Sequence, residues 1–175
     1  MQAIRLKTEH LFDPVGVGFT APRLYWNCSG GRKQIAYQII AADDSGSILW
    51  DSGRVESSAM CVRWGGSPVP AKTKVLWQVR LWNENNDCGE WAAASFETGI
   101  DAWKAGWITG NYPVNKKERY PVDCFRKTFH AADVKKARLY ITACGLYEAR
   151  LNDQRVGNFV LAPGITDYRK RVQYQ

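Results

Sequence analysis

Cysteine and histidine are the side chains whose chemistry would be simplest to recognise in this sequence, either as zinc ligands or as a nucleophile with its base. The chain has five cysteines and two histidines: Cys28, Cys61, Cys88, Cys124 and Cys144, with His10 and His130. A zinc site needs closely spaced Cys and His ligands, and a catalytic thiol needs a nearby base. Neither spacing occurs here, so we predict no metal site and no cysteine nucleophile, and we expect free thiols.

Carboxylates are the next groups to consider, since two of them on either side of a cleft can hydrolyse a glycosidic bond. Most acidic residues here fall in predicted turns or at strand ends, as Asp43, Asp44 and Asp51 do. Glu148 lies inside a strand pattern, and we favour a structural role for it, with a hydrogen-bonding partner if it faces inward. The sequence also lacks a phosphate-binding glycine loop, a Gly-x-Ser-x-Gly motif and a His-Glu-x-x-His motif. We therefore assign no catalytic residue.

The net charge of +7 suggests a nucleic-acid partner, but its distribution along the chain weakens that interpretation. Residues 1–99 carry ten basic and ten acidic side chains, whereas residues 100–175 carry fourteen basic and seven acidic ones. The segment 168–174 places basic residues beside tyrosines, yet no RNA-binding signature accompanies it. No apolar run approaches the ~18 residues of a membrane span. We predict neither a nucleic-acid partner nor a membrane partner.

Alternation of apolar and polar residues with period two predicts the elements that would position any site. Four segments show it: 35–41, 75–82, 138–143 and 147–151. In 75–82 the residues expected on one face are Val75, Trp77, Val79 and Leu81, and those expected on the other are Leu76, Gln78, Arg80 and Trp82. In 35–41 the residues expected on one face are Ile35, Tyr37, Ile39 and Ala41. Turn residues separate the segments, and 131–136 allows at most one helical turn. The pattern predicts an all-β chain built as sandwiches.

Composition changes near residue 100, which predicts two domains, 1–99 and 100–175. The basic excess belongs to the second part, and all eight tryptophans lie at or before Trp107. Trp26, Trp50 and Trp77 fall where strands should be buried in a core. The remaining candidates for a sugar-binding surface or a domain junction are Trp82, Trp91, Trp103 and Trp107.

The N-terminal residues do not form a secretory signal. The segment 1–5 lacks a basic start followed by roughly 7–15 apolar residues. Together with the odd number of cysteines, this leads us to expect a cytoplasmic protein.

Short motifs along the chain then suggest a family. The first part has PRLYW at 22–26, IAYQI at 35–39, LWDSGRVES at 49–57, WQVRLW at 77–82 and FETG at 96–99. The second part has WKAGWI at 103–108, GLYE at 145–148, LNDQRVG at 151–157, LAPGITDY at 161–168 and KRVQY at 170–174. The first series resembles the fibronectin-III-like leader of bacterial α-L-rhamnosidases, the inverting glycoside hydrolases that release terminal rhamnose. The second is similar to their N-terminal jelly-roll domain, and 110–122 is the main gap in the match.

The resemblance implies a fibronectin-III/immunoglobulin-like sandwich followed by a partial jelly-roll sandwich. Family members are several times longer, and their catalytic carboxylates lie in a later helical barrel. We therefore expect a non-catalytic N-terminal fragment that packs on that barrel in the whole enzyme. The whole enzyme would act on rhamnose-containing glycosides, and the resemblance leaves self-association into a homo-oligomer open.

Two other functions stay open beside this one. Related jelly-rolls of the family bind rhamnose with calcium, so Asn152, Asp153 and Asp167 are candidate oxygen ligands of a carbohydrate-binding module, although turn chemistry also explains them. We expect no cofactor other than such a calcium ion. The second alternative is a purely structural interaction sandwich, which would expose an apolar patch on the second domain.

Three positions depart from the family pattern. Ile165 stands where the family usually has tryptophan, and Asn152-Asp153 stands where it has Asn-Gly in a hairpin. Val75 occupies the place of the corner tyrosine of such sandwiches, which puts that tyrosine's anchoring hydrogen bond in doubt.

Overall fold

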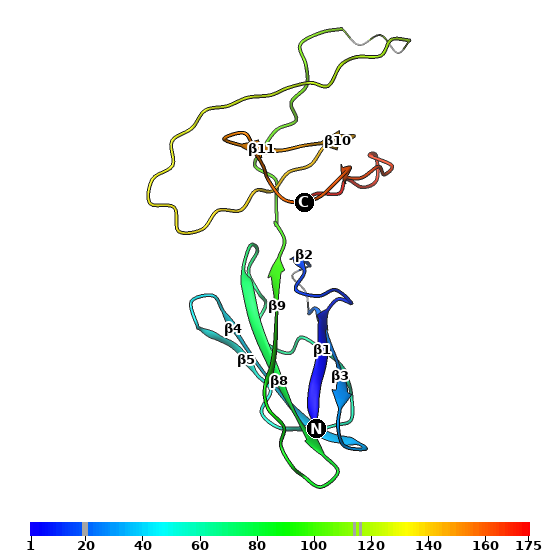
Figure 1. Cartoon of the computed structure of the whole chain (residues 1–175), viewed down its shortest axis with the longest axis vertical. Helices are drawn as coiled ribbons and strands as arrows, with labels where there is room; N and C mark the ends of the chain where they lie inside the picture. The colour runs from blue at the N-terminus through cyan, green and yellow to red at the C-terminus, as the bar shows by residue number, and fades with distance from the viewer. Residues whose placement is uncertain (19–20, 114, 116) are drawn as a thin grey trace. The chain divides into compact units, whose positions relative to one another are not determined.

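The computed structural model describes residues 1–18, 21–113, 115 and 117–175. Within these residues the chain forms strands and no helix, so the all-β prediction is confirmed and the helical turn allowed at 131–136 does not form. The chain divides into two units, Met1–Gly106 and Trp107–Gln175 (Figure 1).

The first unit is a sandwich of two sheets. The smaller sheet has the order β1-β3-β7, from β1 (Gln2–Thr8), β3 (Arg23–Ser29) and β7 (Cys61–Arg63). The larger sheet has the order β2-β9-β8-β4-β5, from β2 (Val15–Val17), β9 (Ala92–Thr98), β8 (Lys74–Asn83), β4 (Gln34–Asp43) and β5 (Ile48–Asp51). A short strand, β6 (Val55–Glu56), also pairs with β4. The chain changes sheets between β1 and β2, and β2 then pairs with β9 in parallel.

The core lies between these two sheets and confirms the alternation predicted for 75–82. The four β8 residues predicted to share one face are each at most 1% exposed: Val75, Trp77, Val79 and Leu81. Leu24 and Trp26 of β3 are buried in the same cluster from the smaller sheet. Burial of large aromatic and branched side chains from both sheets provides the main driving force for folding of this unit.

Strand β4 follows the predicted alternation except at its start. Tyr37, Ile39 and Ala41 are buried as expected, but Ile35 is half-buried and Gln34 is buried instead. The register shifts at this end of β4, since Gln34 pairs with Asn83 and Ala36 pairs with Trp82. The buried amide is satisfied: its Oε1 accepts from the Trp26 indole at 2.9 Å, and its Nε2 donates to two carbonyl oxygens at 3.0 Å.

The loop before β8 is anchored without a corner tyrosine. Val75 is fully buried and carries no polar group. The hydroxyl of Thr98, which is also buried, donates to the Pro70 carbonyl at 2.6 Å and accepts from the Thr73 N–H at 2.9 Å. Thr98 of β9 therefore supplies the anchoring hydrogen bonds that the corner tyrosine, replaced here by Val75, would otherwise make.

The second unit has short strands and almost no core. It contains β10 (Leu146–Tyr147) paired with β13 (Ala162–Pro163), and β11 (Arg150–Leu151) paired with β12 (Gln154–Arg155). Of its described residues, Ala162 and Pro163 alone are buried.

Two strand predictions in this unit need correction. The segment 138–143 forms no strand. Ile141 exchanges two backbone hydrogen bonds of 3.0 Å with Gln175, and the Thr142 hydroxyl donates to the Gln173 carbonyl. These contacts with the C-terminal residues do not make a regular strand ladder. The segment 147–151 is interrupted at 148–149, between β10 and β11.

Candidate functional site

The predicted residues Asn152 and Asp153 form the two-residue turn of the β11–β12 hairpin. Their φ angles are 49° and 63°, and Arg150 pairs with Arg155 across the hairpin. Positive φ at both central residues is the geometry of a type I′ turn, and Asn and Asp tolerate it better than most residues. The expected tight turn is confirmed. The Asp153 carbonyl oxygen also accepts from the Arg150 guanidinium at 3.1 Å.

The third predicted residue, Asp167, is held by its own neighbours. Its Oδ1 accepts from Arg169 Nε at 3.0 Å, and its Oδ2 accepts from Arg169 Nη2 at 3.1 Å. The Arg169 guanidinium, followed by the Arg169 backbone N–H, lowers the pKa of the Asp167 carboxyl below its usual value. The Asp167 carbonyl accepts from two N–H groups further along, at Lys170 and Arg171. Asp167 thus closes a turn.

Asn152, Asp153 and Asp167 do not belong to a cluster of metal-binding side chains among the described residues. Within the part of the chain that the structure describes, no three or more His, Cys, Asp or Glu side chains gather where they could hold a metal ion. Calcium needs six to eight oxygen ligands around one point. Calcium binding at Asn152, Asp153 and Asp167 therefore remains a prediction from resemblance alone.

Glu148 lies on the outside of the hairpin strands and binds arginine. Its Oε1 accepts from Arg150 Nε at 2.8 Å, and its Oε2 lies 3.9 Å from Arg155 Nε. Both partners are exposed, so the pairs contribute little stability. The structural role expected for Glu148 agrees with these contacts.

Carboxyl groups that could act as a general acid need a raised pKa. The described carboxyls with a clear pKa shift are Glu9, Asp43, Asp51, Glu84 and Asp167, and all five are shifted downward. In each of them, hydrogen-bond donors stabilise the charged carboxylate. At Asp51, for example, Gln38 Nε2 donates to Oδ1 at 2.8 Å. These groups are arranged for structure and not for proton donation.

Two of the four tryptophans considered for sugar binding, Trp82 and Trp91, lie against arginine. The Arg80 guanidinium carbon lies 5.1 Å from the ring centre of Trp82 and 4.6 Å from that of Trp91, and Arg54 lies 4.9 Å from Trp82. Trp82 is 8% exposed. Trp82 therefore leaves little surface for a pyranose, and the Arg80 guanidinium already lies against the indole of Trp91. Trp103 and Trp107 are exposed.

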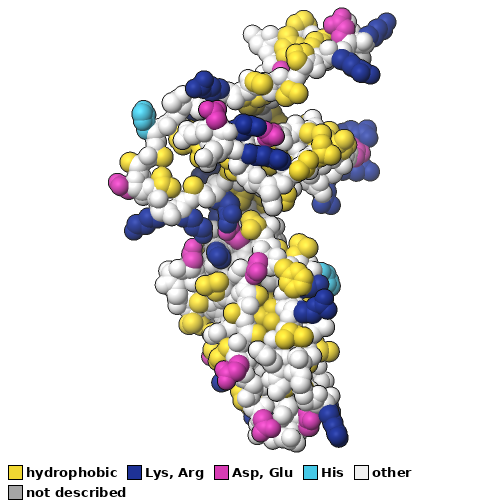
Figure 2. All heavy atoms as spheres, in the orientation of Figure 1, with side chains coloured by type: hydrophobic (Ala, Val, Ile, Leu, Met, Phe, Trp, Pro, Cys, Tyr) yellow, Lys and Arg dark blue, Asp and Glu magenta, His cyan; other side chains and the backbone are white. Residues whose placement is uncertain are grey.

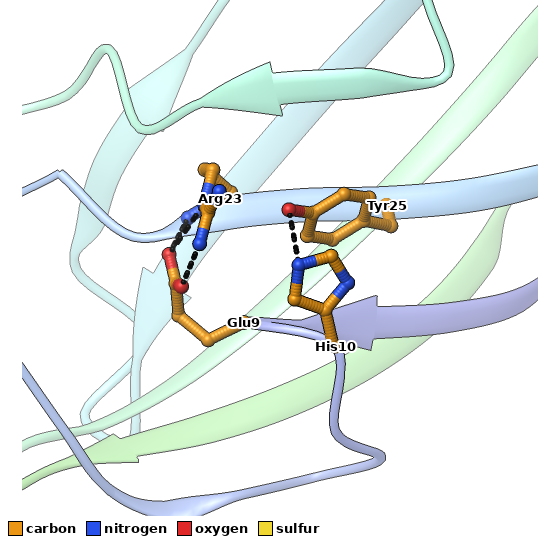
Figure 3. A network of polar contacts seen from close by, with 4 residues as sticks. All are labelled: Glu9, His10, Arg23 and Tyr25. Carbon is orange, nitrogen blue, oxygen red and sulfur yellow. Dashed lines mark hydrogen bonds and ion pairs between the residues drawn. The ribbon is translucent and has the colours of Figure 1, made fainter.

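A polar cluster that the sequence did not predict lies where β1 meets β3. Glu9 Oε2 accepts from Arg23 Nη2 at 2.8 Å, and Glu9 Oε1 accepts from the Arg23 backbone N–H at 2.6 Å (Figure 3). His10 Nε2 lies 3.0 Å from the Tyr25 hydroxyl, and the two rings lie 4.4 Å apart between centroids. Hydrogen bonds from Arg23 lower the pKa of Glu9, although partial burial opposes them. The members are 14 or 15 residues apart, so no local motif marks them.

Tyr25 extends this cluster to β7. Tyr25 and Cys61 are paired across β3 and β7. Partial desolvation, followed by a hydrogen bond with the Cys61 thiol, raises the pKa of the Tyr25 hydroxyl. Tyr25 thus links the Glu9–Arg23 and His10 contacts to the neighbouring strand β7 as a hydrogen-bonding group.

Comparison with known proteins agrees with the motifs quoted above. The family model described as the Rha78A-like, N-terminal immunoglobulin domain matches residues 3–102. The family model described as the alpha-L-rhamnosidase N-terminal domain matches residues 132–175.

Individual relatives point the same way. An alpha-L-rhamnosidase of Formosa agariphila is 32% identical over 186 residues, which is 95% of this chain and 20% of that protein. The solved alpha-L-rhamnosidase from Dictyoglumus thermophilum superposes with a TM-score of 0.81 at 30% identity, over 100% of this chain and 23% of that one. The solved alpha-L-rhamnosidase from Aspergillus terreus superposes with a TM-score of 0.79 at 30% identity, and the match covers 99% of this chain and 21% of that one. The chain spans about a fifth of the length of the curated relatives that it matches.

Proposed function

The chain belongs to the α-L-rhamnosidase family, as its motifs predicted, and we propose that it serves as the non-catalytic N-terminal β-sandwich region of a longer glycoside hydrolase that releases terminal L-rhamnose. The observation that carries this proposal is that both matched family models describe N-terminal domains, and together they account for most of the sequence.

The carboxyl groups support the non-catalytic part of the proposal. Inverting glycoside hydrolysis needs a general acid with a raised pKa and a general base, with their carboxyl groups roughly 6.5–9.5 Å apart. The clearly shifted carboxyls of the described residues, Glu9 and Asp167 among them, are all shifted downward and engaged by donors. We place the acid and the base of the whole enzyme outside this sequence.

The second unit supports a packing role. Many large apolar side chains of its described residues are exposed, among them Val122, Phe125, Phe129, Val160 and Ile165. Exposed apolar area of this extent marks an interaction surface or an uncovered core. We propose that further segments of the same enzyme cover these side chains, either by completing the jelly-roll or by packing as the catalytic barrel. No described contact favours sugar binding by this unit instead.

Turnover assays test the proposal directly. Purified 1–175 should not hydrolyse an aryl α-L-rhamnoside, whereas the protein encoded by the complete reading frame should. Turnover by 1–175 alone would refute the non-catalytic role. Failure of the complete protein on a range of aryl glycosides, with rhamnosides included, would refute the proposed reaction. Titration of 1–175 with rhamnose, with and without calcium, followed by calorimetry, separates the structural role from a carbohydrate-binding module.

A further inference from the structure

The outer face of the β1-β3-β7 sheet is rich in arginine and lysine. On β3, Leu24 and Trp26 point into the core, so the alternation places Arg23 and Tyr25 on the opposite face. Their partners across the sheet are Arg63 and Cys61 on β7, both exposed. We call the set Arg5, Lys7, Arg23, Tyr25 and Arg63 the basic face.

A β-bulge brings Arg5 onto this face. Ile4 pairs with Asn27 and Lys7 pairs with Tyr25, so residues 5 and 6 together stand opposite a single residue of β3. Arg5 has a φ of 54°, an uncommon conformation for a residue with a side chain, and it is exposed while Leu6 is buried. The bulge therefore keeps Leu6 in the core and adds a cation outside.

Charge in the first 99 residues is unevenly distributed, with a basic excess on the smaller sheet. Strands β1, β3 and β7 and the turn after β1 hold four basic residues against one acidic residue, Glu9. The rest of residues 1–99 therefore holds six basic residues against nine acidic ones. Figure 2 shows basic side chains gathered beside a histidine on the flank that carries β1 and β3. The zero net charge of this part conceals a strongly positive face.

The cations of the basic face are incompletely neutralised by the protein itself. Glu9 binds Arg23, and the Lys7 ammonium lies 4.8 Å from the centre of the Phe12 ring. Arg5 and Arg63 make no ion pair with any residue that the structure describes. Arg63 also stands directly opposite Arg23, and like charges in that position repel. A bound anion would relieve this repulsion.

We propose that the basic face binds an acidic polysaccharide, one that carries carboxylate or sulfate groups along its chain. This inference rests on the proposed function, because a glycoside hydrolase needs contact with a glycan beyond its active site only when the glycan is a polymer. Cations spaced along and across three strands match charges repeated along such a polymer. The rings of Tyr25 and His10, together with Phe12, which is 60% exposed, lie among these cations and offer apolar surface to sugar rings.

Binding to polygalacturonate and to dextran sulfate tests the inference, with neutral dextran and polyglutamate as comparisons. The whole chain 1–175 is titrated by calorimetry at low salt, where exposed charges are least screened. The test variant is Arg5→Gln with Arg63→Gln. The matched control is Arg32→Gln with Lys33→Gln, which removes the same charge from the β3–β4 loop and keeps the backbone N–H groups that bind Glu84. Unfolding curves show whether each variant keeps its fold.

The test variant should lose affinity for polygalacturonate, dextran sulfate or both by about tenfold, and the control by no more than about twofold. Phe12→Ser should weaken polysaccharide binding without changing net charge. Equal losses in the two double variants would overturn the inference, because the basic second unit would then attract any polyanion. Absence of binding would also overturn it, and equally tight, face-dependent binding of polyglutamate would assign the face to an acidic protein. Turnover of a neutral aryl rhamnoside by the complete enzyme is independent of this face, so failure here leaves the proposed function standing.

Discussion

The indole Nε1–H of Trp77 donates a hydrogen bond of 3.2 Å to the hydroxyl oxygen of Thr8, and this bond joins the two sheets of the first unit. Trp77 lies in the middle of β8, and Thr8 ends β1. Both side chains are at most 1% exposed. A buried indole N–H has no access to water, so Thr8 supplies the acceptor that lets a tryptophan occupy the centre of this core.

Replacing Thr8 with valine should therefore destabilise the first unit. The substitution keeps the shape of the side chain and leaves the Trp77 N–H without an acceptor, which costs about 1–3 kcal/mol of the free energy of unfolding. Urea unfolding followed by tryptophan fluorescence measures this cost. Thr8→Ser keeps the hydroxyl and should retain more stability than Thr8→Val. Equal stability of the two variants would mean that the bond contributes nothing.

The Thr98 hydroxyl should be equally important at the end of β9. It satisfies the Thr73 N–H and the Pro70 carbonyl at once, in a place where related sandwiches use a tyrosine. Thr98→Val removes both bonds and should lower the free energy of unfolding by about 1–3 kcal/mol. Amide exchange at Thr73 should accelerate in this variant, and Thr98→Ser should restore its protection. Unchanged exchange in the valine variant would contradict the anchoring role.

Strands were predicted best from the sequence where local alternation of apolar and polar residues determines which side chains are buried. In β8 the four residues Val75, Trp77, Val79 and Leu81 are all buried, although Trp82, expected on the opposite face, is buried as well. At the start of β4 the same reasoning chose Ile35, because nothing local reveals that Gln34 can be buried by accepting from Trp26 eight residues away. In 138–143 the alternation is present in the sequence, but no strand forms there, because a strand also needs a regular hydrogen-bonded neighbour along its length.

The candidate sites also show that local sequence patterns can be recognised, whereas contacts between residues distant in the sequence cannot. Asn152 and Asp153 were recognisable because turn chemistry is local, and the hairpin confirms their turn. The basic face cannot be recognised from charge along the chain, because its residues lie on three strands that are separated in sequence by acidic segments. The structure shows that Ile4 and Arg5 both face outward at the bulge, and an isoleucine next to Ala3 gives no sequence signal of that exposure.

The ion pair of Glu9 with Arg23 should make stability depend on pH. The pKa of Glu9 is lowered in the folded state from its usual value of 4.5, so the contribution of the pair is present above that value and is lost as pH falls through the lower, folded-state pKa. Glu9→Gln should therefore lower the urea midpoint at pH 7 and have little effect well below pH 4. Glu56→Gln, which removes a more exposed carboxylate paired with Arg54, is the control. A Glu9→Gln effect that is the same at both pH values would rule out this ion pair as its cause.

The β11–β12 hairpin should become more stable when Asp153 is replaced with glycine. Asp153 has a φ of 63°, and glycine adopts this conformation without steric cost. The lost interaction is small, because Arg150 binds the backbone oxygen of Asp153 and glycine keeps that oxygen. We expect a gain of about 0.5–1 kcal/mol for the hairpin, seen as slower amide exchange at Val156, whose N–H donates to the Ala149 carbonyl. Asp153→Ala should accelerate that exchange, and an opposite order of the two variants would contradict the turn geometry.

The two units should differ sharply in resistance to protease. The first unit buries a continuous cluster that includes Trp26, Trp77 and Phe96, whereas Ala162 and Pro163 are the buried residues among those described in the second unit. Local opening requires little free energy where few apolar contacts are broken. Limited proteolysis of 1–175 should therefore cut within 107–175 first and leave a stable product that ends near residue 106. In the complete enzyme the same peptide bonds should resist cleavage, because the proposed covering segments would bury exposed side chains such as Phe129 and Ile165. Rapid cleavage of 107–175 in the complete enzyme as well would show that nothing packs on this unit, and the packing role would have to be abandoned.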